Sequence, residues 1–396
     1  MTYDFDVVVD RTITNDMKWH AEGIKRYMNL KIPEKFIPMW IADMDFKTAN
    51  SVAAAIKKRA EHEIYGYPFY GKDYFASLIK WNKKRYNWDV DASWISPMSG
   101  VLPAVNLAIR TFTNEGDAVI IQQPVYDPFA GMIQKTGRRI ANNPLQIVDG
   151  EYKMNYEHLE ELIKAENAKL MILCSPHNPV GKVWKKEELE KLGDICERYG
   201  VLVISDEIHC DIVYIGQKHY PFALGAPKML QNMIICTSPA KTFNVPGIRN
   251  ANIIIPNEEI RQKFNQAKES YSQPNYNTFS LEVVPAAYSD DGEEWLEQLL
   301  VYLEGNVDFT MDFLKQRMPK VKTIRPTGTF LMWLDFSEYG YTDTELQTIL
   351  CEKAGVVCVQ GSWFGAGGEG YIRFNIASPR SIVKDALEKI EVVLNN

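Results

Sequence analysis

Between residues 96 and 255, the hydrophobic positions form short, nearly continuous runs that end in polar turns and alternate with amphipathic stretches. Runs that are apolar at every position are typical of strands buried on both faces, and apolar residues spaced three and four apart are typical of helices. These patterns predict strands at 117–122, 170–174, 201–205, 233–237 and 251–255, and helices at 102–112 and 186–199. Apolar strands separated by helices indicate an α/β fold with a mainly parallel sheet covered on both faces.

The chain on either side of this region has a different pattern. Residues 1–40 are predicted to be irregular, and helical spacing at 51–62 and 72–86 flanks an aromatic loop. The last third predicts one long helix, two half-buried strands and two further helices, which is an α+β arrangement. These elements are expected at 293–318, 329–336, 343–353, 371–376 and 381–394. We therefore predict a large domain at 48–286 and a small domain formed by 1–47 and 287–396.

Composition narrows the class of protein. The 396 residues are 46% hydrophobic and 24% charged, with a formal net charge of −7, and the basic residues are scattered. This distribution predicts a soluble globular protein without a nucleic-acid-binding face. No apolar run approaches membrane-spanning length, and the start of the chain lacks the features of a signal peptide. The six cysteines show no CxxC spacing, so we expect buried free thiols in a reducing cytoplasm, and no metal site is predicted.

Lys241 is the first candidate for chemistry. It follows the apolar run 233–237 directly after the turn Ser238-Pro239-Ala240. A lysine at the end of a buried strand is partly desolvated, which disfavours its ammonium form and makes the free amine a usable nucleophile or base. A covalent bond to an aldehyde cofactor is a common use of such an amine. A lysine that points into solvent from a strand end is the ordinary structural alternative.

Other polar residues stand where further predicted strands end. In open α/β sheets, ligands bind beyond the carboxyl ends of the strands. Asp206 follows an apolar run, where a buried carboxylate needs a cation such as a pyridinium nitrogen. Arg373 lies within the predicted strand 371–376, where an arginine in apolar company commonly holds a carboxylate or phosphate. Further candidates are the helix-start amides of Gly100 and Val101 for a phosphate, Tyr126 for stacking on a planar ring, Asn178 for a hydrogen bond, and Arg249.

Taken together, these residues resemble the fold-type I pyridoxal-phosphate enzymes over nearly the whole chain. The resemblance rests on Ser-Pro-His-Asn-Pro-Val-Gly at 175–181, Ser-Asp-Glu-Ile-His at 205–209, Ser-Pro-Ala-Lys-Thr-Phe-Asn at 238–244, and Arg373. Within that superfamily, the chain is most similar to the MalY/PatB-type cysteine–sulfur β-lyases. That likeness rests on Met-Trp-Ile-Ala-Asp-Met-Asp-Phe at 39–46, Tyr-Gly-Tyr at 65–67, and His209, where related aminotransferases usually carry tyrosine.

The resemblance implies a seven-stranded-type sheet and a role for each candidate residue. Lys241 is expected to bind pyridoxal 5'-phosphate covalently and to act as the catalytic base, while Arg373, with Asn178 beside it, binds the substrate α-carboxylate. A packed core histidine is the ordinary alternative for His209. The other expected cofactor contacts are Asp206 at the ring nitrogen, Asn178 and His209 near the ring oxygen, Tyr126 on the ring, and Gly100, Val101, Ser238, Arg249 and Tyr67 at the phosphate. Tyr67 is expected to come from the partner subunit of a homodimer.

The activity implied by the resemblance is cleavage of cystathionine, cysteine or S-substituted cysteines to a thiol, pyruvate and ammonia. Two alternatives stay open on the sequence. One is an aminotransferase on the same fold, against which His209 and the stretch 39–46 argue. The other is a regulatory or binding protein that acts by docking to a partner, against which the presence of Lys241, Asp206 and Arg373 argues.

Overall fold

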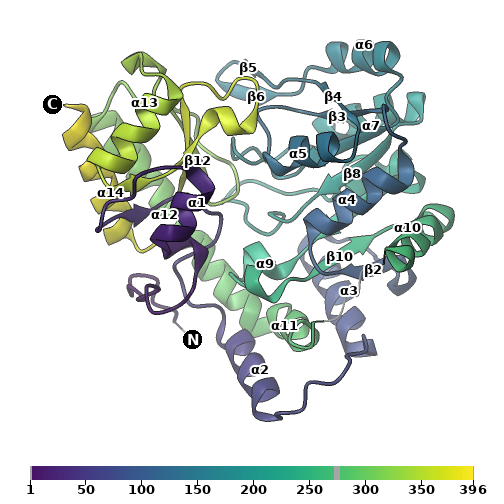
Figure 1. Cartoon of the computed structure of the whole chain (residues 1–396). Coiled ribbons are helices and arrows are strands. Elements are labelled where there is room, and N and C mark those ends of the chain that lie inside the picture. The colour runs from purple at the N-terminus through teal and green to yellow at the C-terminus, as the bar shows by residue number, and fades with distance from the viewer. Residues whose placement is uncertain (1, 272–276, 396) are drawn as a thin grey trace.

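A seven-stranded sheet forms the centre of the computed structural model, which describes residues 2–271 and 277–395 (Figure 1). The strand order is β2-β10-β9-β8-β7-β3-β4. All neighbouring pairs are parallel except those of β10, which runs antiparallel to both β2 and β9. The strands are β2 (Ile95–Met98), β3 (Ala118–Ile121), β4 (Arg139–Asn142), β7 (Leu170–Cys174), β8 (Leu202–Asp206), β9 (Met233–Thr237) and β10 (Ala251–Ile254). The mainly parallel sheet expected from the apolar runs is confirmed.

Helices cover both faces of this sheet because alternate strand residues point to opposite sides. One face, represented by Ile204 and Ile234, packs on α4 (Val101–Phe112), α5 (Pro128–Lys135) and α10 (Glu258–Ser270). The other face, represented by Val203 and Ile235, joins the larger core. The helices of that larger core include α2 (Asn50–Glu61), α3 (Lys72–Tyr86), α6 (Tyr156–Glu166), α7 (Lys186–Tyr199), α8 (Phe222–Gly225) and α11 (Ser280–Ala287). Every residue of β7, β8 and β9 is buried, as such a sandwiched sheet requires.

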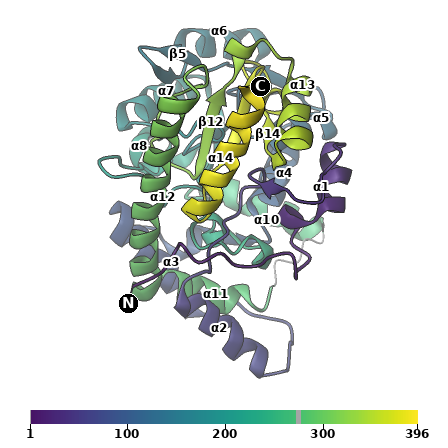
Figure 2. The ribbon, with the colours of Figure 1, turned by 90° about the vertical axis from the view of Figure 1, so that its left-hand side faces the viewer.

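A second, antiparallel sheet of order β11-β12-β15-β14 is built from the last third of the chain. Its strands are β11 (Lys322–Thr323), β12 (Leu331–Asp335), β14 (Val359–Gln360) and β15 (Tyr371–Asn375). The long helix α12 (Asp290–Arg317) and α14 (Arg380–Leu394) pack side by side next to it (Figure 2). The N-terminal segment joins this part, because β1 (Ile37–Pro38) pairs in parallel with β13 (Val356–Val357). The domain limits at 47/48 and 286/287 stay a prediction.

Several elements differ from the sequence expectation. The segment 1–40 is not wholly irregular, since it contains α1 (Ala21–Met28), whose Ile24 and Met28 lie four residues apart on a buried face. His20 caps the start of this helix by accepting from the Gly23 amide, and Asn29 ends it in a left-handed conformation. The helix expected at 343–353 is divided into α13 (Asp343–Thr348) and a π-helical turn at Ile349–Lys353. Two short strands, β5 (Gln146–Val148) and β6 (Glu151–Lys153), form a hairpin that was not predicted, although its two-residue turn Asp149-Gly150, with positive φ at both residues, is a typical hairpin signal.

The structure also bears on the cysteines, on membrane-spanning helices and on metal sites. All six cysteines are buried and unpaired, as predicted from their spacing. Within 2–271 and 277–395, no helix combines the length and apolar character that crossing a membrane requires. In the same described ranges, no group of three or more His, Cys, Asp or Glu residues is placed to hold a metal ion.

Candidate active site

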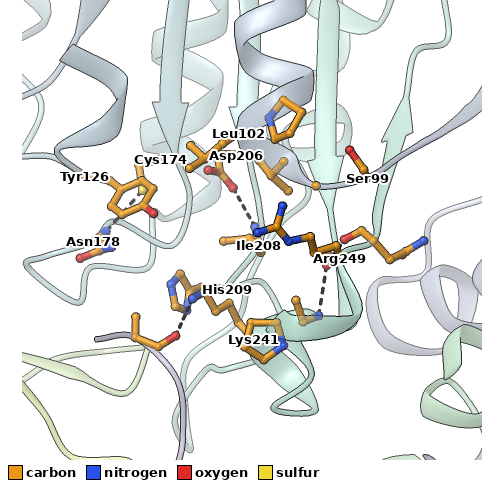
Figure 3. A pocket seen from close by; sticks show the side chains of 18 residues that line it. Ser99, Leu102, Tyr126, Cys174, Asn178, Asp206, Ile208, His209, Lys241 and Arg249 are labelled. Atoms are coloured by element: carbon orange, nitrogen blue, oxygen red, sulfur yellow. Dashed lines mark hydrogen bonds between the residues drawn. The ribbon is translucent and has the colours of Figure 1, made fainter. Parts of the chain in front are cut away.

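A cavity of about 340 Å³ lies beyond the carboxyl ends of the parallel strands (Figure 3). This is the edge of an α/β sheet at which ligands bind. Its walls contain all of the predicted site residues except Arg373 and Tyr67. Those that line it are Gly100, Val101, Tyr126, Asn178, Asp206, His209, Ser238, Lys241 and Arg249. Residues scattered over 150 positions of sequence are thus brought together by the ends of neighbouring strands, although their individual roles stay a prediction.

Lys241 is presented by α9 (Pro239–Thr242), a single turn that follows β9. The hydroxyl of Ser238 caps this turn by accepting from the Ala240 amide, and it donates to the Asn250 carbonyl. The Lys241 amine donates a hydrogen bond to the backbone carbonyl of Ala42. Burial lowers the pKa of Lys241 to about 8, although the nearby Asp43 carboxylate opposes the shift. The lowered pKa raises the fraction of unprotonated amine near neutral pH, which is the form that acts as a nucleophile or base.

Asp206 is the last residue of β8 and is only 4% exposed. Its Oδ1 accepts from the Ile208 amide at 3.1 Å, and among the described residues it forms no ion pair. Burial raises its pKa to about 7. A buried carboxylate without a counter-ion is unfavourable, so this position calls for a cation brought by a ligand. A protonated pyridine nitrogen meets that requirement.

Asp206 should consequently destabilise the cofactor-free protein as the pH rises. The folded pKa lies near 7 and the unfolded pKa near 3.9, so the penalty is absent below about pH 4 and complete above about pH 7. In the cofactor-free protein, Asp206→Asn should therefore raise the free energy of unfolding at pH 8 by about 1–3 kcal/mol, and by less at pH 5. Urea unfolding at both pH values measures this difference. Asp194→Asn is the control, because Asp194 lies at the surface beside Lys228. A variant less stable than the parent at pH 8 would contradict the argument.

His209 and Asn178 also line the first cavity. His209 is buried, its ring packs edge-on against Phe330 with centroids 5.5 Å apart, and its Nδ1 has no partner among the described residues. Burial holds the pKa of His209 well below its ordinary value, and the charges of Lys241 and Arg373 act in the same direction. The imidazole is therefore neutral. Packing against Phe330 does not satisfy its Nδ1, which still lacks a hydrogen-bond partner among the described residues.

The opposite end of the cavity is suited to an anion. Gly100 and Val101 stand at the start of the twelve-residue helix α4, where backbone amides are unpaired and the helix dipole favours negative charge. The Arg249 and Ser238 side chains line the same cavity. Arg249 adopts a left-handed backbone conformation with φ of 51°, directly after the short helical turn at Pro246–Ile248.

Arg373 lines a second cavity of about 230 Å³, which shares Ala42, Tyr126 and Lys241 with the first. Its Nη2 donates to the Trp40 carbonyl at 2.7 Å and its Nη1 to Asn178 Oδ1 at 3.2 Å. Its Nε has no partner in the described part of the chain, and no described carboxylate pairs with the guanidinium. Burial lowers the pKa of Arg373 to about 10. The counter-ion of this buried cation must therefore come from a ligand.

These atoms test whether the site fits pyridoxal phosphate. Three buried polar atoms at the two cavities lack partners within the described ranges, namely His209 Nδ1, Asn250 Oδ1 and Arg373 Nε. Buried polar groups are nearly always satisfied, so unpaired ones mark a place for a polar ligand. A free amine for an aldehyde, an unpaired carboxylate for a pyridinium and helix-start amides for a phosphate are all present. The residues fit the cofactor.

The segment 40–46 supports this site, and sequence patterns alone do not predict that role. Its carbonyls bind both key cations, since Trp40 accepts from Arg373 and Ala42 from Lys241. The stretch is recognisable as a family signature, but its role appears only in the fold. Asn375 donates at 2.7 Å to the carbonyls of Ile41 and Asp43, and Asn244 binds the Met44 backbone with 2.9 Å bonds to its amide and carbonyl.

A buried ionic cluster anchors the outer side of the same segment. Asp45 accepts from Arg11 at 2.7 Å and from Lys18 at 2.8 Å, and Asp43 accepts from Arg11 at 2.9 Å. Trp19 and Ser378 also donate to Asp45. The Lys18 side chain is fully buried, so breaking the cluster from one side would leave an uncompensated charge. We call Arg11, Lys18, Asp43 and Asp45 the N-terminal ionic cluster.

Tyr67 lies apart from both cavities. It is fully exposed on the loop between α2 and α3, where Ile64 and Phe69 are also exposed. Its expected contact with a phosphate across a subunit interface stays a prediction, since one chain does not test it.

Known proteins resemble the chain over its full length. The sequence model of aminotransferase class I and II matches residues 34–390. A Bacillus subtilis protein named cystathionine beta-lyase PatB is 38% identical over 392 residues, which cover 99% of this chain and 100% of that protein. The structure of Treponema denticola cystalysin with its pyridoxal 5'-phosphate cofactor is 34% identical, with a TM-score of 0.95 and coverage of 100% and 99%.

A further structure, the pyridoxal-phosphate-bound C-S lyase of Staphylococcus hominis, is 34% identical. Its TM-score is 0.92, and the match covers 100% of this chain and 99% of that one. The agreement therefore extends over the whole fold. This chain belongs to the aminotransferase class I and II family.

Proposed function

We propose that the protein is a pyridoxal-phosphate-dependent carbon–sulfur β-lyase. Its substrates are cystathionine, cysteine or S-substituted cysteines, and its products are a thiol, pyruvate and ammonia. The observation that carries the proposal is the arrangement of three unsatisfied charges around two joined cavities, namely the Lys241 amine, the Asp206 carboxylate and the Arg373 guanidinium. The names of the relatives from Bacillus subtilis and Staphylococcus hominis support the choice of lyase.

The first cavity would hold the cofactor. Asp206 would pair with the ring nitrogen and Tyr126 would lie against the ring, with Asn178 and His209 beside its oxygen. The phosphate would be bound by Gly100, Val101, Ser238 and Arg249. When bound, pyridoxal phosphate supplies an electron sink for negative charge that develops on the substrate Cα.

The second cavity would hold the reacting amino acid. Arg373 binds the α-carboxylate with the Nε that is free for it, and this contact orients the Cα–H bond toward Lys241. The Lys241 amine, whose lowered pKa leaves it partly unprotonated, removes the Cα proton. The Cβ–S bond then breaks, and the thiolate leaves with the bonding electrons and takes a proton. Water then hydrolyses the remaining three-carbon fragment to pyruvate and ammonium.

β-Elimination should exceed amino transfer by a wide margin. Both reactions need Lys241 to remove the Cα proton, but only amino transfer needs that proton to be redelivered to another carbon and a second keto acid to enter. The neutral, buried His209 stands where related aminotransferases carry tyrosine. The test is to measure pyruvate from cystathionine and, separately, the amine transferred from alanine to 2-oxoglutarate. Equal rates of the two reactions would establish the aminotransferase alternative instead.

We further propose a homodimer in which Tyr67 reaches the partner's cofactor phosphate. The exposed apolar residues Ile64, Tyr65, Tyr67 and Phe69 support this, because such a patch is typical of an interaction surface. Sedimentation of the purified protein at micromolar concentration would decide it, and a monomer would refute it.

A cytoplasmic location is also proposed, supported by the six unpaired buried cysteines. Cell fractionation tests the location.

A further inference from the structure

A third cavity, which lies against helix α1, adjoins the second. This third cavity has a volume of about 410 Å³ and shares Met17 and Tyr27 with the second. The three cavities are therefore neighbours, in order from Gly100, past Lys241 and Arg373, to the outer surface at α1. Figure 2 shows α1 on the outside of the molecule.

The second cavity, in the middle of this row, is lined mostly by apolar and aromatic side chains, with the Asp127 carboxylate also on its wall. The Tyr27 ring contacts those of Trp40 and Trp363, with centroids 5.6 Å apart in both cases, and Met17 lies beside them. Among the described residues lining the second cavity, Lys241 and Arg373 are the only cations. Aromatic and thioether side chains suit the uncharged carbon–sulfur chain of a substrate. A carboxylate at the far end of that substrate meets no further cation until it reaches α1.

The third cavity offers one cation and one carboxylate. Arg26 and Glu22 lie four residues apart, hence on one face of α1, and both are exposed. In the described part of the chain neither forms an ion pair within 4.0 Å. Asn15 and His20 add polar atoms to the same wall. A free guanidinium beside a free carboxylate is complementary to an amino-acid head group, whose own carboxylate and ammonium stand close together.

We propose that the third cavity binds the far α-amino-carboxylate of a thioether substrate such as cystathionine. Arg26 binds its carboxylate and Glu22 its ammonium, while Arg373 holds the near carboxylate. Arg26 and Glu22 are thus specificity-determining residues, and the preferred substrates are thioethers that carry a second amino-acid end. Small S-substituted cysteines do not reach α1. This inference rests on the proposed function.

Kinetics with two substrates test the inference. Arg26→Gln should lower kcat/KM for cystathionine by about fivefold, through KM, because it removes a charged hydrogen bond to one end of the ligand. Its kcat/KM for S-methylcysteine should stay within a factor of about two, since that substrate ends before Arg26. Lys25→Gln is the matched control, because Lys25 is an exposed cation on the same helix that does not line the cavity. Glu22→Gln should resemble Arg26→Gln.

A binding measurement separates this inference from the proposed activity. In the cofactor-loaded Lys241→Ala protein, calorimetry should give a Kd for cystathionine that rises about fivefold when Arg26→Gln is added. If the wild type releases no pyruvate but this Kd still depends on Arg26, the lyase function fails and the inference survives. Equal losses for both substrates in Arg26→Gln, or no loss for either, would overturn the inference. Cystathionine binding no tighter than that of S-methylcysteine would also overturn it.

Discussion

Replacing Lys241 by alanine should lower the rate of pyruvate release from cystathionine by at least about a thousandfold, within the range that general base catalysis contributes. Lys241 is the only lysine among the described residues that line the two cavities, and burial lowers its pKa to about 8. Without it, the proposed base for the Cα proton is lost. Borohydride should attach the cofactor covalently to the wild-type protein and bleach its visible colour, whereas the variant should show no such attachment at this position.

Lys268→Ala is the control for that experiment. Lys268 is a half-buried lysine on α10 whose pKa is also lowered by burial, but it lines neither cavity of the site. Its replacement should leave pyruvate release within a factor of about two, because surface changes away from a site are usually mild. If Lys241→Ala kept more than about a tenth of the wild-type rate, or still bound the cofactor reducibly at the same place, the base would have to be another residue.

Removing the Arg373 side chain should cost about 2–5 kcal/mol of transition-state binding, which corresponds to a loss of roughly 30-fold to several thousandfold in kcat/KM. The guanidinium is buried, lies 5.0 Å from the centre of the Phe364 ring and has its Nε free within the described ranges. It is therefore positioned to bind a carboxylate away from bulk water. Steady-state kinetics of Arg373→Ala measure the loss, and the visible spectrum shows whether the cofactor stays bound, as we expect.

Arg325→Ala provides the matched comparison for Arg373→Ala. Arg325 also comes from the C-terminal third, but its partners Glu304 and Asp308 lie near the surface. Exposed ion pairs contribute little, so its loss should leave kcat/KM nearly unchanged. Wild-type kinetics in Arg373→Ala would assign the carboxylate contact to a different residue.

The sequence predicted functional residues best where they follow directly after a buried strand. Asp206 and Lys241 stand at or just beyond the ends of β8 and β9, and the apolar runs mark both ends clearly. The strand of Arg373 was also located, but the expected half-buried alternation is wrong, because every residue of β15 except Tyr371 is buried. Asp206 and Lys241 lie at the same cavity because β8 and β9 are neighbours that end at a common edge, whereas Arg373 reaches the site from the separate antiparallel sheet.

The N-terminal ionic cluster could not be predicted in the same way. Arg11 and Lys18 lie 34 and 27 residues from Asp45 in the sequence, and charge pairs at such separations have no periodic signal. Helix α1 is similarly hidden, because only eight residues carry its pattern and two of them are buried. The third cavity and its unpaired Arg26 depend on that helix, so the sequence alone gives no indication of them.

The two carbonyls of segment 40–46 have a consequence for how this protein can change over evolutionary time. Trp40 and Ala42 contact Arg373 and Lys241 through their backbone oxygens, two residues apart on a segment that bends at Ile41 and Ala42. The spacing between the proton-removing amine and the carboxylate anchor is therefore set by main-chain length rather than by side-chain identity. Substitutions at 40 and 42 that fit the surrounding space preserve that spacing. An insertion or deletion of a single residue between them would shift one contact relative to the other. Amino-acid substitutions are therefore tolerated here, whereas changes in the length of the segment are not.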